Sequence, residues 1–284
     1  MGSIENNASN NDMDVGIGRI STPSYSAPNE IRQESFLTWL KNIFCPNFKY
    51  SSIIFILTCL DLIIYTLTIL FGIKPTPYEL LAPKFETLDL FGMKYPSKIY
   101  RGQVHRLILF ALLHANLVHL VSNLLSQIIL GSIMEGLIGT TKAGILYLLS
   151  SVCGGLFSCV FNFSPGVGAS VAIFGILGGY FGFTIINWNN VKDNMNYMMN
   201  FCFMILIVIM NASFGLRSEV IDNYGHLGGF LYGFFWIFVL IKPKGDNNGL
   251  SMFLTYDSWK KCSTIILLVS IISLIFIFWI IQRP

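Results

Sequence analysis

The sequence predicts an all-α polytopic membrane protein, built as a six-helix bundle followed by one C-terminal transmembrane helix. Of its 284 residues, 54% are hydrophobic and 12% are charged, whereas about a quarter are charged in an ordinary soluble domain. The apolar residues gather in runs near or above the roughly 20 residues that a helix needs to cross a bilayer. These observations exclude a soluble enzyme, a disordered regulator and a nucleic-acid binder, and a net charge of +3 indicates no polyanionic partner.

The first fifty residues differ in composition from the rest of the chain. Residues 1–50 are rich in Asn, Ser, Pro and charged side chains, and they contain no apolar run long enough for a signal peptide or a helix core. We therefore expect a disordered tail. The six cysteines show no CxxC spacing, so neither a disulfide framework nor a metal site is indicated.

From residue 51 onward, the apolar runs predict seven spans. They cover residues 51–72, 107–134, 143–163, 169–187, 197–215, 225–241 and 263–281. The domain division that follows is a core over 51–242, a polar linker over 243–262, and the last helix with a short tail over 263–284.

The short loops predict the orientation, because an excess of Lys and Arg stays in the cytosol. Lys142, Lys192 and the group at 242–261 mark the cytosolic side, together with the N-terminal tail. The longer loop over 73–106 carries six basic residues and three acidic ones, which weakens the assignment without reversing it. We expect the N-terminus in the cytosol and the C-terminus on the lumenal or extracellular side.

Polar side chains inside the spans are costly and are therefore functional candidates. They cluster in the second predicted span, which holds His114, Asn116, His119, Asn123 and Gln127. Residues four apart share one face of a helix, so His119 and Asn123 can present two hydrogen-bond donors to one point.

The fourth and sixth spans carry glycine faces beside a serine and a histidine. Gly175/Gly179 and Gly178/Gly182 in the fourth span are Gly-xxx-Gly pairs, the spacing that lets helix backbones approach closely. The sixth span repeats the device over residues 225–233. Two such helices can bring Ser170 and His226 into hydrogen-bond range, which is the minimum for an activated serine nucleophile. All three polar clusters are expected at one depth of the membrane.

Simpler interpretations stand beside these. Taken alone, Ser170 is more often a packing residue and His226 a hydrogen-bonded core histidine; only their combination with the second span favours catalysis. Asp61 lies inside the first span as either a proton relay or a structural partner, and Glu135 is expected to act as a cap or loop anchor.

Three segments resemble the signature helices of the rhomboid intramembrane serine proteases. They are His114-Ala115-Asn116-Leu117-Val118-His119-Leu120-Val121-Ser122-Asn123, Gly168-Ala169-Ser170, and His226-Leu227-Gly228-Gly229. Gly102-Gln103-Val104-His105-Arg106 is similar to the family's Gly-Gln-x-Trp-Arg stretch, and Glu135 with Gly139 to its Glu-xxx-Gly element. The resemblance covers about residues 51–242, and six helices plus a C-terminal seventh is the layout of the secretory-pathway type.

The resemblance implies an intramembrane serine endopeptidase with a Ser170/His226 dyad and an oxyanion site made by His119 and Asn123. The supporting residues that it implies are His114, Gly168, Arg106, Glu135 and Gly229. It implies no cofactor and no metal. The substrates would be transmembrane proteins of the bilayer, of type I and resembling surface adhesins, with the enzyme in the secretory pathway or plasma membrane and a protozoan parasite as one setting.

Two residues depart from the family's pattern. Val171 stands where the family usually has a small residue after the nucleophile, and His105 replaces the loop Trp. The rival hypothesis is a non-proteolytic binding or quality-control protein, or a transporter. A transporter is typically built from inverted repeats, and this sequence shows none.

Overall fold

The computed structural model describes residues 51–75, 79–195, 197–199, 201–206, 222–242 and 255–282. All of them belong to one compact unit, Leu40–Pro284. Within these ranges the backbone forms helices, loops and two isolated bridges, Ile73 with Pro83 and Lys94 with Gly166. The predicted all-α fold class is confirmed.

Six long helices make up most of the described chain. They are α2 (Ile53–Phe71), α6 (Leu117–Ile138), α7 (Thr140–Phe161), α8 (Ser170–Ile186), α11 (Asn223–Leu240) and α12 (Tyr256–Ile281). Short elements lie between them: α3 (Phe85–Leu90), α4 (Pro96–Tyr100), α5 (Arg106–Leu109), the 3-10 turn η1 (Phe110–Leu112) and α9 (Trp188–Val191). By length and composition, four of the described helices can cross a bilayer, namely α2, α6, α7 and α12. The chain is therefore an integral membrane protein.

The second predicted span was wrong at its start. Residues 107–112 belong to α5 and η1, and α6 begins only at Leu117. Asn116 takes an extended conformation as the N-cap, and its side chain accepts a hydrogen bond of 2.8 Å from the His119 backbone N–H. Because an N-cap residue ends the preceding conformation and opens a new helix, His114 and Asn116 lie before α6 and not inside it.

Other boundaries moved by smaller amounts. α7 begins at Thr140 and α12 begins at Tyr256, so the last helix takes in residues 256–262 that were expected in the linker. In the expected fifth span, the described residues up to 206 are helical within Tyr197–Leu206. Residues 207–215, the tail over 1–50 and the linker part over 243–254 lie outside the described residues.

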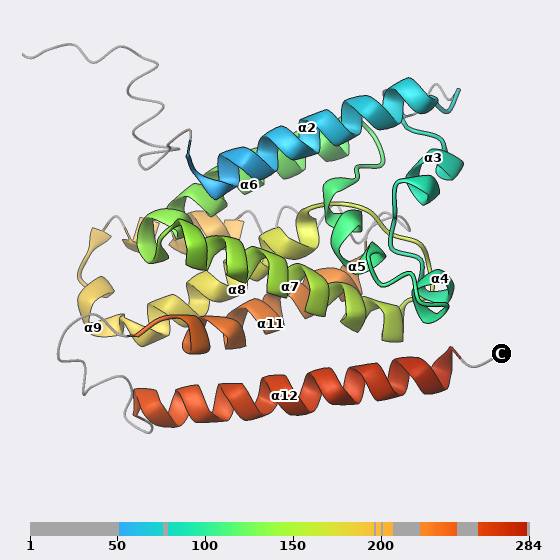
Figure 1. Ribbon diagram of the computed structural model, residues 1–284. Coiled ribbons are helices and arrows are strands. Elements are labelled where there is room, and N and C mark those ends of the chain that lie inside the picture. Colours follow the sequence, from blue (N-terminus) through green and yellow to red (C-terminus); the bar gives the residue numbers. More distant parts are fainter. Residues whose placement is uncertain are drawn as a thin grey trace, which may run out of the picture. The chain divides into compact units, whose positions relative to one another are not determined.

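The helices run between two ends of the bundle (Figure 1), and contacts between the elements identify each end. At one end lie α3, α4 and α5, and we call it the loop end. The start of α8 lies at this end, as the hydrogen bond of 3.0 Å from Gly168 N–H to Phe110 O of η1 shows. The end of α12 also lies there: the ring of Trp279 in α12 is 4.8 Å from the ring of Tyr100 in α4. At the opposite end, the Ser52 hydroxyl at the start of α2 donates to Glu135 near the end of α6.

Helix α8 packs against α11 at very short range because glycines face each other. A Cβ on Gly178 would lie 2.0 Å from the backbone oxygen of Phe230, and one on Gly233 would lie 2.0 Å from the oxygen of Gly175. No larger side chain fits at such a contact. The predicted glycine faces thus do meet, and they bring the first turns of the two helices together.

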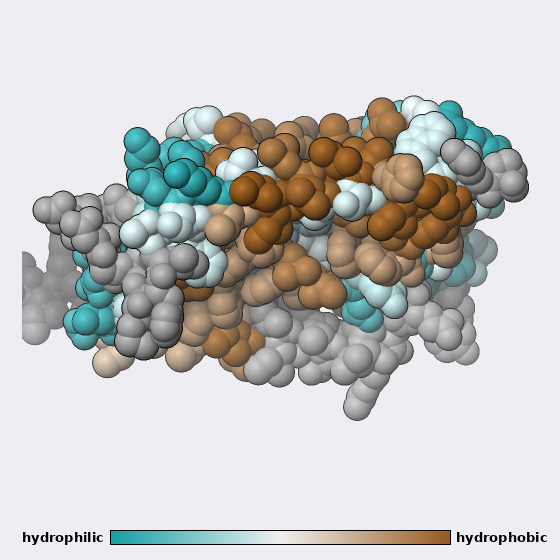
Figure 2. Space-filling model, turned by 90° about the horizontal axis from the view of Figure 1, so that it is seen from below, coloured by the Kyte–Doolittle hydropathy of each residue, from teal (hydrophilic) through white to brown (hydrophobic). Residues whose placement is uncertain are grey.

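Helix α12 lies along α7 and α11 (Figure 1). Most of its side chains are exposed. Its exposed apolar residues include Ile265, Leu268, Ile272 and Phe276. Seen from this side, the described surface shows a continuous apolar zone between more hydrophilic ends (Figure 2). Such a belt is the surface that contacts hydrocarbon in a membrane protein.

Candidate active site

The structure places Ser170 and His226 side by side. The Oγ of Ser170 lies 2.8 Å from Nε2 of His226, which is hydrogen-bond distance, although the residues are 56 positions apart in the chain. His226 is 9% exposed and Ser170 is half-buried. A hydroxyl that donates to an imidazole nitrogen is the arrangement in which the imidazole can remove the hydroxyl proton.

Local structure orients both side chains. Ser170 is the first residue of α8, and His226 lies in the first turn of α11. Phe174 follows Ser170 by four residues, so it shares the same face of α8. Its ring stacks on the His226 ring with 4.3 Å between centroids and 5° between planes. Stacking on Phe174 therefore fixes the plane of the imidazole ring, and the hydrogen bond to Ser170 fixes the direction of Nε2.

Two further hydrogen-bond donors lie close to Gly168, which precedes Ser170 by two residues. A Cβ on Gly168 would lie 2.9 Å from Nε2 of His119 and 3.5 Å from Nδ2 of Asn123. Gly168 has φ +130°, a conformation that glycine adopts freely, so it keeps this space open. Asn123 is buried, and its Nδ2 has no hydrogen-bond partner within the described part of the chain.

The hydrogen bonds of His119 indicate its tautomer. Its Nδ1 accepts from the backbone N–H of Ala115 at 3.4 Å. In a neutral imidazole one nitrogen accepts and the other carries the proton, so Nε2 is the donor, and it points toward Gly168. Two donors therefore converge on the space beside Gly168, two residues before Ser170.

His114, another of the expected site residues, packs against His119. It is fully buried, and its ring meets the His119 ring edge to face with 5.4 Å between centroids.

The other expected site residues, Arg106, Glu135 and Gly229, make contacts away from the Ser170 and His226 side chains. Arg106, the first residue of α5, is buried. It donates to Met93 O at 2.9 Å and pairs with Asp89 at 3.1 Å. Glu135 accepts from the backbone N–H of Ile53 at 3.3 Å and joins the start of α2 to α6. A Cβ on Gly229 would lie 2.1 Å from Val171 O, so this glycine permits the α8–α11 contact.

A buried ion pair that the sequence did not reveal lies next to the site. Lys94, between α3 and α4, is fully buried and its ammonium contacts Asp222 and the Ser158 hydroxyl. Burial alone would raise the pKa of the Asp222 carboxyl, but Lys94 and hydrogen bonds from Ser158 and the Gly225 N–H lower it below its ordinary value. Asp222 immediately before a helix is an N-cap signal, but no local pattern indicates that its partner is Lys94, 128 residues away.

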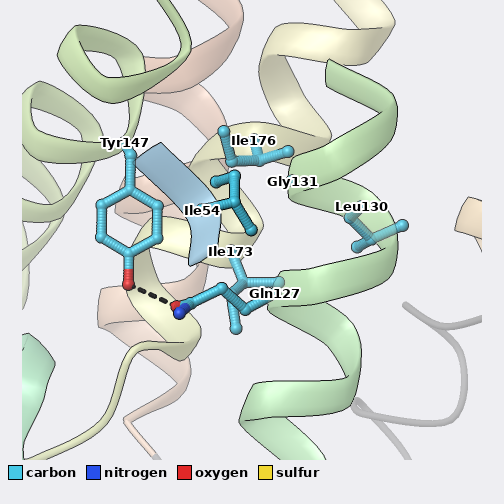
Figure 3. Close-up of a pocket in the computed structure, with 7 residues that line it drawn as sticks. All are labelled: Ile54, Gln127, Leu130, Gly131, Tyr147, Ile173 and Ile176. Atoms are coloured by element: carbon cyan, nitrogen blue, oxygen red, sulfur yellow. Dashed lines mark hydrogen bonds between the residues drawn. The ribbon is translucent and has the colours of Figure 1, made fainter. Parts of the chain in front are cut away.

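A second buried polar network joins α2, α6 and α7. Gln127 donates to Asp61 at 2.9 Å and accepts from the Tyr147 hydroxyl at 2.7 Å. Gln127 and Tyr147 also line a small pocket (Figure 3). The residues that line it are Ile54, Gln127, Leu130, Gly131, Tyr147, Ile173 and Ile176. The pocket has no room for a water molecule and includes neither Ser170 nor His226, so it is not the reaction site.

The chain resembles known proteins over the segment that holds these residues. The family model of the Rhomboid domain matches residues 101–243. Rhomboid-like protease 2 of Toxoplasma gondii is 30% identical over 225 residues, which are 78% of this chain and 76% of that protein. Rhomboid-like protease 1 of the same organism is 33% identical and covers 66% of this chain and 64% of its own length.

A plant relative, RHOMBOID-like protein 5 of Arabidopsis thaliana, is 37% identical over 57% of this chain. The chain spans about half the length of the plant relatives RHOMBOID-like protein 5 and RHOMBOID-like protein 7, at 52% and 51%. The matched segment runs from just before α5 to just after α11, whereas α2 and α12 lie outside the family model.

Proposed function

This chain belongs to the rhomboid family, and on that premise we propose that it is a serine endopeptidase that cleaves single-span proteins within the membrane. The observation that carries the proposal is the 2.8 Å hydrogen bond between Ser170 Oγ and His226 Nε2, in a pair that Phe174 stacks into place. Relatives named as rhomboid-like proteases support the same activity.

In the first half of the reaction, His226 acts as the general base. Its Nε2 takes the Ser170 hydroxyl proton while Oγ forms a bond to the carbonyl carbon of the substrate. The tetrahedral intermediate carries its negative charge on the former carbonyl oxygen. His226 then returns the proton to the leaving amine, the C–N bond breaks, and an acyl-enzyme at Ser170 remains.

Donors beside Gly168 stabilise the negative charge that develops. The Nε2–H of His119 and the Nδ2–H of Asn123 face the space that Gly168 leaves open. Fixed donors at such a place stabilise the transition state more than the ground state, because the charge on oxygen grows as the bond forms. The Ser170 backbone N–H is the third donor that we assign.

Water completes the reaction. It attacks the acyl carbon while His226 accepts its proton, and the proton passes to Ser170 Oγ as the acid product leaves. A peptide bond inside a helix is shielded by its own hydrogen bonds, so we expect a preference for substrates with helix-breaking residues near the cleavage point.

The test is cleavage of a single-span membrane protein by the purified chain in liposomes. Ser170→Ala should abolish cleavage and labelling by a fluorophosphonate, because both need the hydroxyl nucleophile. Ser151→Ala is the matched control: Ser151 is a buried helical serine whose Oγ has no partner among the described residues. Undiminished cleavage by Ser170→Ala would contradict the nucleophile, and no cleavage by the wild type would favour a binding protein.

A further inference from the structure

Lys94 is buried completely although it lies in a loop between two short helices. Its ammonium contacts Asp222 and the Ser158 hydroxyl, and its side chain is 0% exposed. Lysine is almost never fully buried unless it is paired. This one residue connects the loop to the end of α7 and to the start of α11.

The backbone of Lys94 also holds the segment that leads to the proposed nucleophile. Lys94 N–H donates to Gly166 O at 3.0 Å, and Gly166 N–H donates to Lys94 O at 3.0 Å. A Cβ on Gly166 would lie 3.2 Å from Cε of Lys94, so the lysine stem passes directly over this glycine. Four residues after Gly166, the chain reaches Ser170.

Asp222 sets the first turn of α11, where His226 lies. Its carboxylate accepts from the Gly225 N–H at 3.0 Å, and its backbone oxygen accepts from the His226 N–H at 3.0 Å. The same carboxylate accepts from the Ser158 hydroxyl at 2.6 Å. A shift of Asp222 would therefore move the backbone that carries the imidazole.

We propose that Lys94, Asp222 and Ser158 form a positioning site that holds Ser170 and His226 at their reacting distance. The site rests on the proposed function and acts through the Gly166 backbone on one side and the first turn of α11 on the other. None of its side chains needs to touch the substrate. An ion pair of purely structural value would instead affect unfolding and leave the rate of the folded enzyme unchanged.

The experiment compares Lys94→Met, Asp222→Asn and the double variant in the full-length chain. Asparagine keeps the oxygen that caps α11 but removes the charge. We measure kcat and KM for a single-span substrate, and the fluorophosphonate labelling rate of Ser170, each per folded protein. Each single variant should lower kcat and the labelling rate on the order of 10²-fold while KM stays nearly unchanged.

The double variant should regain part of that loss. A single substitution leaves a buried charge without its partner, whereas the double variant leaves none. Recovery in kcat links the effect to the pair, because two independent losses would multiply.

Lys98→Met is the matched control. Lys98 lies four residues after Lys94, in α4, and pairs with Asp89, but its ion pair does not reach α7 or α11. It should lose stability at most and keep its kcat.

The outcomes separate the two proposals. If the wild type cleaves and the Lys94 and Asp222 variants keep its kcat and labelling rate, the positioning site is wrong and the protease remains. A fall in substrate cleavage with unchanged labelling also overturns the site, since Ser170 activation is then intact. If the wild type neither cleaves nor labels, both proposals fail.

Discussion

Asn123 is a proposed oxyanion donor whose side-chain amide makes no other hydrogen bond through Nδ2 within the described residues. Its Nδ2 is buried and unpaired within the described residues, next to the space over Gly168. Asn123→Ala should therefore lower kcat by about 10²–10³-fold, the usual cost of removing one oxyanion donor, and leave KM nearly unchanged. Steady-state kinetics on a single-span substrate measure both. Ser122→Ala, exposed and adjacent on α6, serves as the control; equal kcat for the two variants would remove Asn123 from the mechanism.

Val171 departs from the family's pattern, and the structure shows what accommodates it. A Cβ on Gly225 would lie 2.9 Å from Cγ2 of Val171 and 2.8 Å from Oδ2 of Asp222. Gly225 thus supplies the space for the larger side chain at 171, directly before His226.

This contact predicts a coupling between the two positions. Gly225→Ala should lower both the melting temperature and kcat, and adding Val171→Ala should restore part of each, because one of the two clashes is then removed. Contacting residues typically show interaction energies of about 0.5–3 kcal/mol in a double-mutant cycle. Strict additivity of the two substitutions in thermal unfolding would show that Val171 and Gly225 do not share this space.

At the scale of elements, the α8–α11 contact depends on glycine backbones. Gly233→Ala would place a Cβ 2.0 Å from the backbone oxygen of Gly175, which cannot rotate away. We expect a loss of about 1–3 kcal/mol or more, the range for overpacking a closely packed contact, together with slower labelling of Ser170. In the control Gly144→Ala, the three atoms nearest to the new Cβ all belong to the Ile53 side chain, the nearest at 3.1 Å. Thermal unfolding in detergent compares the two, and equal melting temperatures would refute the close contact.

The N-terminus of α11 predicts an acid-sensitive contribution to stability. The pKa of Asp222 is lowered below its ordinary value of 3.8 in the folded state, so its ion pair stabilises the fold fully above that pH. The contribution is lost as pH falls through the lower, folded-state pKa. The difference in melting temperature between wild type and Asp222→Asn should therefore be constant near neutral pH and shrink in acid. A difference that grows in acid would contradict this sign.

These elements also show which parts of the fold and of the site the sequence predicts and which it does not. Long apolar runs and glycine spacings predicted the main helices and the meeting of Ser170 with His226, because both depend on local patterns. The start of α6 was missed because an average over apolar residues does not register the N-cap at Asn116. Lys94 was missed for another reason: its partners Ser158 and Asp222 come from distant parts of the chain, and only the fold brings them together.

For the whole molecule, the distribution of free basic side chains bears on how it sits in the membrane. At the end opposite the loop end, the exposed lysines among the described residues are Lys142, Lys192, Lys242 and Lys261. At the loop end, four of the six basic residues are in ion pairs with carboxylates, namely Lys74, Lys94, Lys98 and Arg106, whereas Lys84 and Arg101 are exposed. Because most of the loop's positive charges are paired, they argue less strongly against a lumenal or extracellular loop end than their number in the sequence suggests.

We accordingly expect the loop end, with the proposed active site, on the lumenal or extracellular side, because free Lys and Arg favour the cytosol. A glycosylation acceptor inserted at Arg101, which is exposed at the loop end, should be modified in microsomes. The same acceptor inserted after Lys242, before α12, should stay unmodified. Protease protection of a tag on each insertion provides a second measurement. The reverse pattern would place Ser170 and His226 near the cytosolic face, and the substrates would then be cut on that side of the membrane.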